Sequence, residues 1–507
     1  MERTPSFTRR DFVVGGLVCA AGAGTSSFAA VKNSAHHNDA EILELTATEA
    51  LHLMRSGDLT SERYTAALLK QCRKRHDLNA FIWLNDEHVL EAARAADRTG
   101  KGVGNLPLRG LPIVLKDNID TAKAPTTAGT PALRDNRPRA DAPVAASLFS
   151  AGALLLGKTN MHELAFGITS NNAAFGAVHN PYNLAMIPGG SSGGTAAAIA
   201  GRLCPVGLGT DTGGSVRIPA ALCGIVGLRT SSGRYSTKGV VPLSHTRDVV
   251  GPLARVVRDL ILVDSIITGE SAAVEPVRLK GLRLGVPRSF FYEDLDSELS
   301  PVVESALAKL RDAGCILVEA DIPDIEKLSA ISGRLSYFEC MADLARYLKD
   351  SGIPLTAREV VEKIASPDVK KVYEESVFGP KAPTAESYQH ALTVERPALQ
   401  AAYREYFRTQ DVAAIVFPTT ILPARPIGDD TDVELNGKRL PTLLTFTHNA
   451  RPVTSAGLPG LSIPIGQTAS GLPVGLEFDG PEGADRSLLG MGLSAEKVFG
   501  RLRAPAV

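Results

Sequence analysis

The sequence predicts an α/β protein: one large domain in which helices cover both faces of a central mixed β-sheet. Short apolar runs, separated by turns that carry Gly or Pro, alternate with helix-like stretches. This alternation is typical of a sheet covered on both faces. The 507 residues are 44% hydrophobic and 21% charged, which are globular values and exclude a disordered or collagen-like chain.

The first part of the fold, residues 39–100, is expected to be helical. Thr46 and Glu49 have the spacing of a capping box at a helix N-terminus, and Gly57 is placed to end that helix. A second helix is expected over residues 60–75, where apolar side chains recur on one face.

The chain then changes to short apolar runs that predict buried strands. These runs are residues 111–115, 153–156 and 204–208, with a helix-like stretch at 140–150 between them. Residues 275–410 carry more charge and helical periodicity, as in 300–313 and 397–408, and predict a helical excursion from the sheet. Strand-like runs return at residues 413–417, 461–465 and 474–478.

Residues 1–30 have the features of an export signal and are not expected to belong to the fold. Arg9 and Arg10 precede a mildly apolar stretch, 12–29, and residues 27–30 offer a small-x-small cleavage site. The paired arginines, with Phe two positions beyond them, resemble a twin-arginine signal. An uncleaved membrane anchor is the alternative, which the Gly and Ser content disfavours. We therefore expect export to the periplasm, with membrane contact only during export.

The composition excludes several kinds of partner and site. There are 54 Lys and Arg against 55 Asp and Glu, a net charge of −1, so neither nucleic acid nor an anionic membrane surface is expected as a partner. The six cysteines include no C-x-x-C pair, which excludes zinc ribbons and redox pairs. We expect buried thiols rather than disulfides, and the sequence leaves open whether two copies form a homodimer.

Two motif matches are misleading. Residues 152–159 satisfy the phosphate-loop pattern, but 153–156 is expected to be a buried strand, so no loop is available to surround a phosphate. Residues 190–194 satisfy the nucleophile-elbow pattern of G-x-S-x-G, but an elbow follows a strand directly, and here loop residues precede it.

Three other segments carry residues suited to nucleophilic catalysis without histidine. Lys116 ends a short apolar strand. A Gly- and Ser-rich loop at 188–195 contains Ser191, and a second Gly-rich loop at 209–217 contains Ser215. A lysine can replace histidine as the base that activates a serine, so these segments predict a Ser–Lys type of site.

The run from Gly189 to Arg217, with Lys116 75 residues before Ser191 and Ser191 24 before Ser215, resembles the amidase signature family. The similarity extends over about residues 106–258 and includes 471–475. The resemblance implies one amidase domain over 39–505 with its catalytic core at about 106–258. It also implies a triad of Lys116, Ser191 and Ser215, a cis peptide bond between Gly190 and Ser191, and no metal or cofactor.

These residues have distinct expected roles. A lysine with an ordinary pKa of about 10.4 is almost fully protonated at neutral pH, so desolvation must lower the pKa of Lys116 before it acts as a base. Lys116 would accept a proton from Ser191, which takes one from Ser215 as Ser215 attacks the carbonyl. The backbone N–H groups of Thr212, Gly213, Gly214 and Ser215 would bind the oxyanion. Asp211 and Arg217 are expected to form an ion pair that shapes this loop.

Residues 157–172, 233–235 and 244–248 are similar to the mandelamide and indoleacetamide hydrolase subgroup of that family. This similarity implies a primary amide of a short aryl-bearing acid as substrate, released as carboxylate and ammonia. Ala165, Gly167 and Thr169 are expected to border the substrate pocket. The roles of His162 and His179 are left open, since a lone histidine is often structural.

Other functions are weighed against this hypothesis. A peptide amidase or other acylamidase of the same family is the main alternative. The glutaminyl subunit of the transamidosome shares this domain, but it works in the cytoplasm, and the leader argues against it. A non-catalytic exported binding protein is the third alternative, and the intact triad argues against it.

Overall fold

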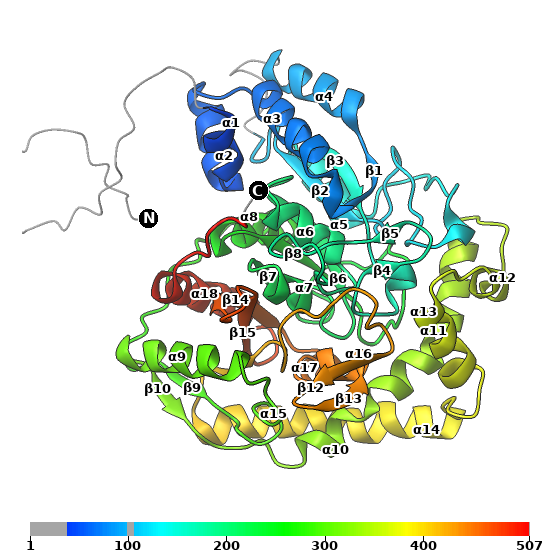
Figure 1. The fold of residues 1–507 in the computed structure, drawn as a ribbon, viewed down its shortest axis with the longest axis vertical. Helices are drawn as coiled ribbons and strands as arrows, with labels where there is room; N and C mark the ends of the chain where they lie inside the picture. The colour runs from blue at the N-terminus through cyan, green and yellow to red at the C-terminus, as the bar shows by residue number, and fades with distance from the viewer. Residues whose placement is uncertain (1–37, 99–105, 506–507) are drawn as a thin grey trace, which may run out of the picture. The chain divides into compact units, whose positions relative to one another are not determined.

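A sheet of eleven strands forms the centre of the described part of the chain, residues 38–98 and 106–505 of this computed structural model (Figure 1). Its strands are β1 (Phe81–Leu84), β2 (Pro112–Lys116), β3 (Leu154–Thr159), β6 (Val206–Asp211), β7 (Val226–Arg229), β8 (Val249–Ala254), β9 (Arg283–Gly285), β10 (Ile316–Val318), β11 (Ala414–Pro418), β14 (Gly460–Gln467) and β15 (Pro473–Asp479). Two small pairs lie outside it, β4 (Asn171–Asn172) with β5 (Gly176–Ala177), and β12 (Asp432–Leu435) with β13 (Lys438–Pro441).

The strand order is β1-β3-β2-β6-β8-β7-β14-β15-β11-β9-β10. Strand β2 runs parallel to β3 and β6, and β9 runs parallel to β10 and β11. The other neighbours are antiparallel. The predicted mixed sheet is therefore confirmed. The export signal expected at residues 1–30 lies outside the described residues.

The helices connect these strands in chain order. They are α1 (Asp39–Glu44), α2 (Ala47–Ser56), α3 (Ser61–Lys74), α4 (Asp86–Arg98), α5 (Pro143–Ser150), α6 (Gly193–Ala200), α7 (Arg217–Leu222), α8 (Val257–Thr268), α9 (Leu299–Asp312), α10 (Ile325–Ser329), α11 (Ile331–Asp350), α12 (Ala357–Glu362), α13 (Pro367–Val372), α14 (Ala385–His390), α15 (Arg396–Gln410), α16 (Thr442–Phe446), α17 (Arg451–Ala456) and α18 (Asp485–Phe499). Short 3-10 turns are η1 (His76–Leu78), η2 (Pro131–Leu133) and η3 (Glu163–Ala165), and π-helical turns are η4 (Tyr373–Val377) and η5 (Ala391–Glu395).

The predicted N-terminal helices are found with their caps. The Thr46 side chain accepts the N–H of Glu49 at the start of α2, and Gly57 ends that helix in the left-handed conformation at φ 89°. Thr60 caps α3. The expectation that residues 39–100 are all helical is wrong at β1, whose aromatic and β-branched side chains favour a strand that pairs with β3.

The excursion predicted over residues 275–410 is mostly helical, but it also contributes two strands to the sheet. Strand β9 pairs with β11, and β10 pairs with β9 at the end of the strand order. In the part of the chain that follows these strands, α11 packs against α12, and buried side chains of α13 belong to the same apolar cluster (Figure 1). These two strands were not predicted, because three-residue strands leave little periodicity in a sequence.

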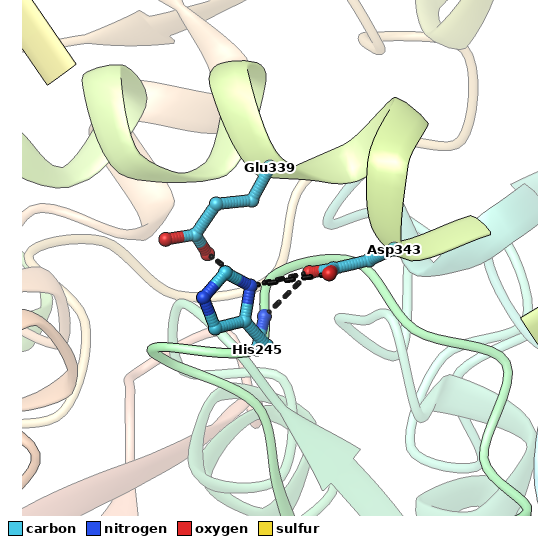
Figure 2. A group of neighbouring side chains, drawn as sticks. All are labelled: His245, Glu339 and Asp343. Carbon is cyan, nitrogen blue, oxygen red and sulfur yellow. Dashed lines mark hydrogen bonds and ion pairs between the residues drawn. The ribbon is translucent and has the colours of Figure 1, made fainter. Parts of the chain in front are cut away.

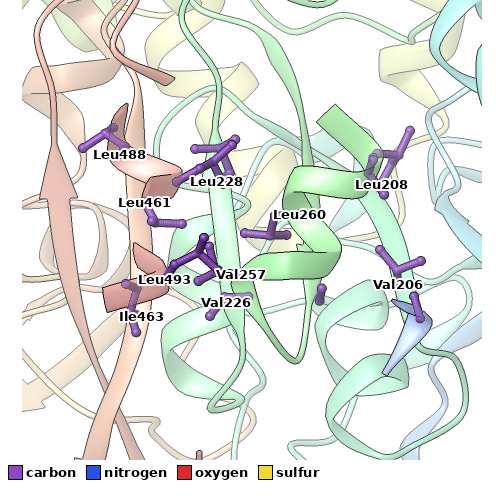
Figure 3. Packing of buried hydrophobic residues seen from close by; sticks show 14 of the residues in the cluster. Val206, Leu208, Val226, Leu228, Val257, Leu260, Leu461, Ile463, Leu488 and Leu493 are labelled. Carbon is purple, nitrogen blue, oxygen red and sulfur yellow. The ribbon is translucent and has the colours of Figure 1, made fainter. Parts of the chain in front are cut away.

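The two faces of the sheet carry different kinds of side chain. Figure 3 shows α8 and α18 packed with leucine and valine side chains against β6, β7 and β14. On the other face the strands present small residues to α6 and α7. A Cβ on Gly209, for example, would lie 2.6 Å from Ser192 Oγ, so only glycine lets the loop before α6 approach β6 this closely. Both site loops therefore pack directly on the sheet.

Five cysteines lie in the described residues, and all five are free and buried, as expected. None of the helices in the described ranges combines the length and the apolar character that a membrane span requires.

Candidate active site

The predicted site residues meet at one edge of the sheet. Strands β2 and β6 are parallel neighbours, with Leu115 opposite Leu208, so their C-terminal ends lie together. Lys116 is the last residue of β2, and the 209–217 loop follows from β6. The loop with Ser191 leads into α6, which packs on both strands. Segments distant in sequence thus converge.

Lys116 is fully buried and bound to the first serine. Its Nζ donates hydrogen bonds to Ser191 Oγ and to Thr210 Oγ1, each at 2.7 Å. Burial lowers the pKa of Lys116 to about 7, although the carboxylates of Asp211 and Asp248 act in the opposite direction. A substantial share of the amine is therefore uncharged at neutral pH, as a general base requires.

The Gly190–Ser191 peptide bond is cis, as the resemblance implied. Ser191 is buried, and its carbonyl oxygen accepts the N–H of His162 at 3.2 Å. The loops of the two serines are joined through the backbone, where Ser192 N–H donates to Ser215 O at 3.2 Å. Within the described ranges, the hydroxyls of Ser191 and Ser215 form no hydrogen bond with each other. Of the expected proton path, the Lys116–Ser191 step is in place and the Ser191–Ser215 step is not formed.

Ser215 lies at the wall of a cavity of about 480 Å³, together with Thr212 and Gly213. The Gly214 N–H donates to Asp211 Oδ1 at 2.9 Å, so it is not available to an oxyanion. This turn needs glycine at position 214, where φ is +112° and a Cβ would lie 2.6 Å from Ile218 Cδ1. In the described structure the N–H groups of Gly213 and Ser215 have no hydrogen-bond partner. Of the four predicted oxyanion donors, the N–H group of Gly214 is therefore the one that is already used.

The Asp211 carboxylate holds the turn that contains Ser215 through hydrogen bonds and ion pairs. It accepts the N–H groups of Gly214 and Val216 and pairs with Arg217 Nε at 3.1 Å and Arg229 NH1 at 3.1 Å. Burial alone would raise the pKa of Asp211, but the two guanidinium groups outweigh it and hold the pKa below its ordinary value. The predicted Asp211–Arg217 ion pair is therefore present, with Arg229 as a second cation.

Of the three residues expected to border the substrate pocket, two lie in the lining of this cavity. Ala165 and Gly167 line it, whereas Thr169 is turned away and its Oγ1 donates to Asp430 Oδ1 at 2.6 Å. Sequence reasoning missed Arg247 and Arg451, which also line the cavity. Arg247 lies in the 244–248 segment whose similarity had been noted, but nothing local signalled Arg451.

His162 and His179 have structural environments. His162 is fully buried, its Nδ1 accepts the Ser170 N–H at 3.1 Å, and its Nε2 lies 2.9 Å from Asp368 Oδ2. It therefore fastens the wall segment 165–170 to α13. His179 Nδ1 contacts Leu184 O at 2.6 Å and does not line the cavity.

A further polar cluster joins the 244–248 segment to α11 (Figure 2). His245 Nδ1 lies 2.9 Å from Asp343 Oδ2 and 3.6 Å from Glu339 Oε2. Glu339 already accepts hydrogen bonds from Ser244 Oγ at 2.6 Å and Tyr388 OH at 3.0 Å. Because protein donors occupy these carboxylates, the cluster fastens the segment to the helix and is not assigned as a metal centre.

The fold and the site together define a class of enzyme. In this class, two Gly-rich loops, each with a serine, meet a buried lysine at the edge of a mixed sheet, beside a cavity. The chain belongs to the amidase family, whose model, described as "Amidase", matches residues 63–489.

Individual relatives agree with this assignment. The chain is 44% identical over 453 residues to an indoleacetamide hydrolase of Agrobacterium vitis, covering 89% of this chain and 96% of that protein. It is 37% identical over 480 residues to a mandelamide hydrolase of Pseudomonas putida, covering 91% and 93%. The structure of the native peptide amidase from Stenotrophomonas maltophilia superposes with a TM-score of 0.77 at 30% identity, covering 91% and 98%. The protein is an amide-hydrolysing enzyme.

Proposed function

We propose that this protein hydrolyses a small aryl-bearing primary amide to its carboxylate and ammonia, through an acyl-enzyme on Ser215. One observation carries the proposal. The Nζ atom of buried Lys116, whose pKa is lowered to about 7, lies 2.7 Å from Ser191 Oγ, and Ser215 on the adjoining loop lines a cavity. A neutral amine in this place can receive a proton without help from a histidine.

The proposed acylation begins when Ser215 Oγ attacks the amide carbon. The Ser215 proton passes to Ser191 as the Ser191 proton passes to Lys116, and the N–H groups of Gly213 and Ser215 stabilise the oxyanion. The ammonium of Lys116 then returns a proton along the same path to the leaving nitrogen, which departs as ammonia. Rotation of the Ser215 hydroxyl toward Ser191 completes the path, since catalytic hydrogen bonds often tighten only with substrate.

Deacylation repeats the relay with water in place of Ser215. Water attacks the ester carbon and gives one proton through Ser191 to Lys116, and the path then returns a proton to Ser215 Oγ as the product leaves as the carboxylic acid, which ionises to the carboxylate in water. Each half-reaction restores neutral Lys116. Apart from the attacking water, the groups that act in this sequence all belong to the chain.

The apolar part of the cavity supports an aryl acyl group. Phe166, Ile168, Leu243 and Leu443 contribute to its lining, and its volume of about 480 Å³ lies within the range of small-molecule sites. The similarity to hydrolases of indoleacetamide and mandelamide points to the same substrate class. Ammonia release across a panel of aryl and aliphatic primary amides tests the proposal, with Ser215→Ala as the baseline.

A peptide amidase is the second candidate, because the chain shares its fold and 30% of its sequence with a peptide amidase of known structure. Comparing C-terminal peptide amides with aryl amides at equal concentration separates the two. If a fluorophosphonate probe fails to label Ser215 and no amide is hydrolysed, a binding protein becomes the better explanation.

We also propose that residues 1–30 direct export to the periplasm by the twin-arginine route. The paired arginines, the mildly apolar stretch and the small-residue site support this. Replacing Arg9 and Arg10 together by Lys is expected to leave the enzyme in the cytoplasmic fraction, and unchanged periplasmic recovery would contradict it.

A further inference from the structure

The cavity in front of Ser215 has a one-sided charge. Three cationic side chains line it, those of Arg247, Lys381 and Arg451, and among its described lining residues there is no carboxylate. Lys381 forms an ion pair with Glu375 at 2.6 Å, and its side chain is 68% exposed. Its charge is therefore largely neutralised by Glu375 and screened by solvent. The two arginines therefore set the charge of the cavity.

Within the part of the chain that the structure describes, Arg247 donates hydrogen bonds only to neutral acceptors. Its NH1 donates to Ser332 O at 3.0 Å and Ser336 Oγ at 2.7 Å, and its NH2 donates to Thr454 Oγ1 at 2.7 Å. Burial lowers the pKa of Arg247 to about 10, so it stays positive at neutral pH. A Cβ on Gly213 would lie only 3.8 Å from Arg247 NH2, which places this charge beside the Ser215 loop.

Among the described residues, the Arg451 side chain has no hydrogen-bond or ion-pair partner. It begins α17, one turn after Thr447, which also lines the cavity. Its Nε is buried without a hydrogen bond, and no described residue forms an ion pair with its guanidinium. A buried N–H donor without an acceptor is costly to the fold. Such a group facing a substrate cavity is explained by an acceptor that arrives with the ligand.

We propose that Arg451 is a specificity-determining residue, and that the preferred substrate is an amide whose acyl part also carries a carboxylate. This inference rests on the proposed function and narrows its substrate class. Arg451 would bind the carboxylate, and the nearby charge of Arg247 would add to the attraction. The aryl part would lie against the apolar wall formed by Phe166, Ile168 and Leu243.

A stacked aryl ring is the other occupant that a guanidinium attracts. Stacking uses the face of the group, whereas the N–H donors of arginine lie in its plane. A ring over Arg451 would leave the buried Nε–H unsatisfied, so a carboxylate fits the observations better.

The test compares two amides of nearly equal shape. Carboxyphenylacetamide, with the carboxylate at the 3- or 4-position, is compared with the uncharged nitro analogue. In the wild-type enzyme, kcat/KM is expected to be about 10-fold or more higher for the better carboxylate substrate. Arg451→Met should lower kcat/KM for that substrate by about 10- to 100-fold and leave the nitro analogue within about 3-fold. Arg451→Lys should retain part of the preference.

The control is Arg404→Met, which removes an exposed arginine of α15 outside the cavity and should alter neither substrate. Equal losses on both amides in Arg451→Met, or no wild-type preference, overturn the inference and favour stacking or a structural role. Failure of the proposed function is distinct, because then neither amide is hydrolysed above the Ser215→Ala baseline. In that case calorimetric binding of carboxyphenylacetamide to Ser215→Ala, with and without Arg451→Met, still decides whether Arg451 binds the carboxylate.

Discussion

His162 and Asp368 connect the cavity wall to a helix 206 residues further along the chain. Nε2 of His162 lies 2.9 Å from Oδ2 of Asp368, and the other ring nitrogen accepts the Ser170 N–H. Burial alone would lower the pKa of His162, but the Asp368 carboxylate outweighs it and raises the pKa above its ordinary value. The wall that contains Ala165 and Gly167 is thus fixed by a contact between distant segments.

Asp368→Asn is expected to destabilise the protein by about 1–3 kcal/mol, because it removes the charged partner of a buried imidazole. A raised folded pKa contributes stability that is complete below the ordinary histidine value of about 6.5 and is lost as pH rises through the folded value. The loss caused by the variant should therefore be larger at pH 6 than at pH 9. Urea unfolding at the two pH values measures this, and Glu374→Gln, an exposed change on the adjoining η4, is the control.

The lowered pKa of Lys116 predicts how the activity depends on pH on the acidic side. Because burial lowers the pKa of Lys116 to about 7 and the base must be neutral, kcat/KM should rise with pH and level off above that value. Lys116→Met should lower kcat by about 100-fold or more. Its melting temperature should be unchanged or higher, since a lowered lysine pKa opposes folding fully below about pH 7, and this penalty fades as pH rises to the ordinary value of 10.5. Near-wild-type turnover in this variant would refute the base role.

The two serines are expected to differ when each is replaced. Ser215→Ala should abolish both hydrolysis and labelling by a fluorophosphonate, because the nucleophile is gone. Ser191→Ala should keep Ser215 but lower its rate of labelling by about 100-fold or more, because the proton path to Lys116 is broken. Mass spectrometry of the peptide that contains Ser215 measures the extent and rate of labelling in both variants. Rapid labelling in Ser191→Ala would show that Ser191 does not transfer the proton.

Local signals explain why much of the fold and site could be predicted. The capping box at Thr46, the apolar runs of the longer strands and the Gly-rich loops with Ser191 and Ser215 are contiguous patterns. The three-residue strands β9 and β10 were missed because their pairing is decided by distant partners.

The rest of the cavity depends on contacts that no local pattern contains. Thr169 was expected to face the substrate, but it turns to Asp430, 261 residues away. Arg451 comes from α17 and meets Ala165 and Gly167 only in the folded protein. Gly214 was expected to donate to the oxyanion, but the turn directs its N–H to Asp211. Side-chain direction and amide direction are tertiary properties in each case.

Asp211→Asn tests the support beneath the Ser215 turn. The change leaves Arg217 and Arg229 without their shared buried carboxylate and places amide hydrogens near the N–H donors that Asp211 accepts. Breaking a buried ion pair in this way is expected to cost about 3–5 kcal/mol of unfolding free energy. Because the pKa of Asp211 lies below its ordinary value of 3.8, its contribution is present above that value and is lost as pH falls through the folded pKa. The difference from wild type in urea should therefore be full at pH 7 and shrink in acid. The matched control is Asp312→Asn, an exposed carboxylate at the end of α9, and a loss no larger than that of the control would show that Asp211 does not hold the turn.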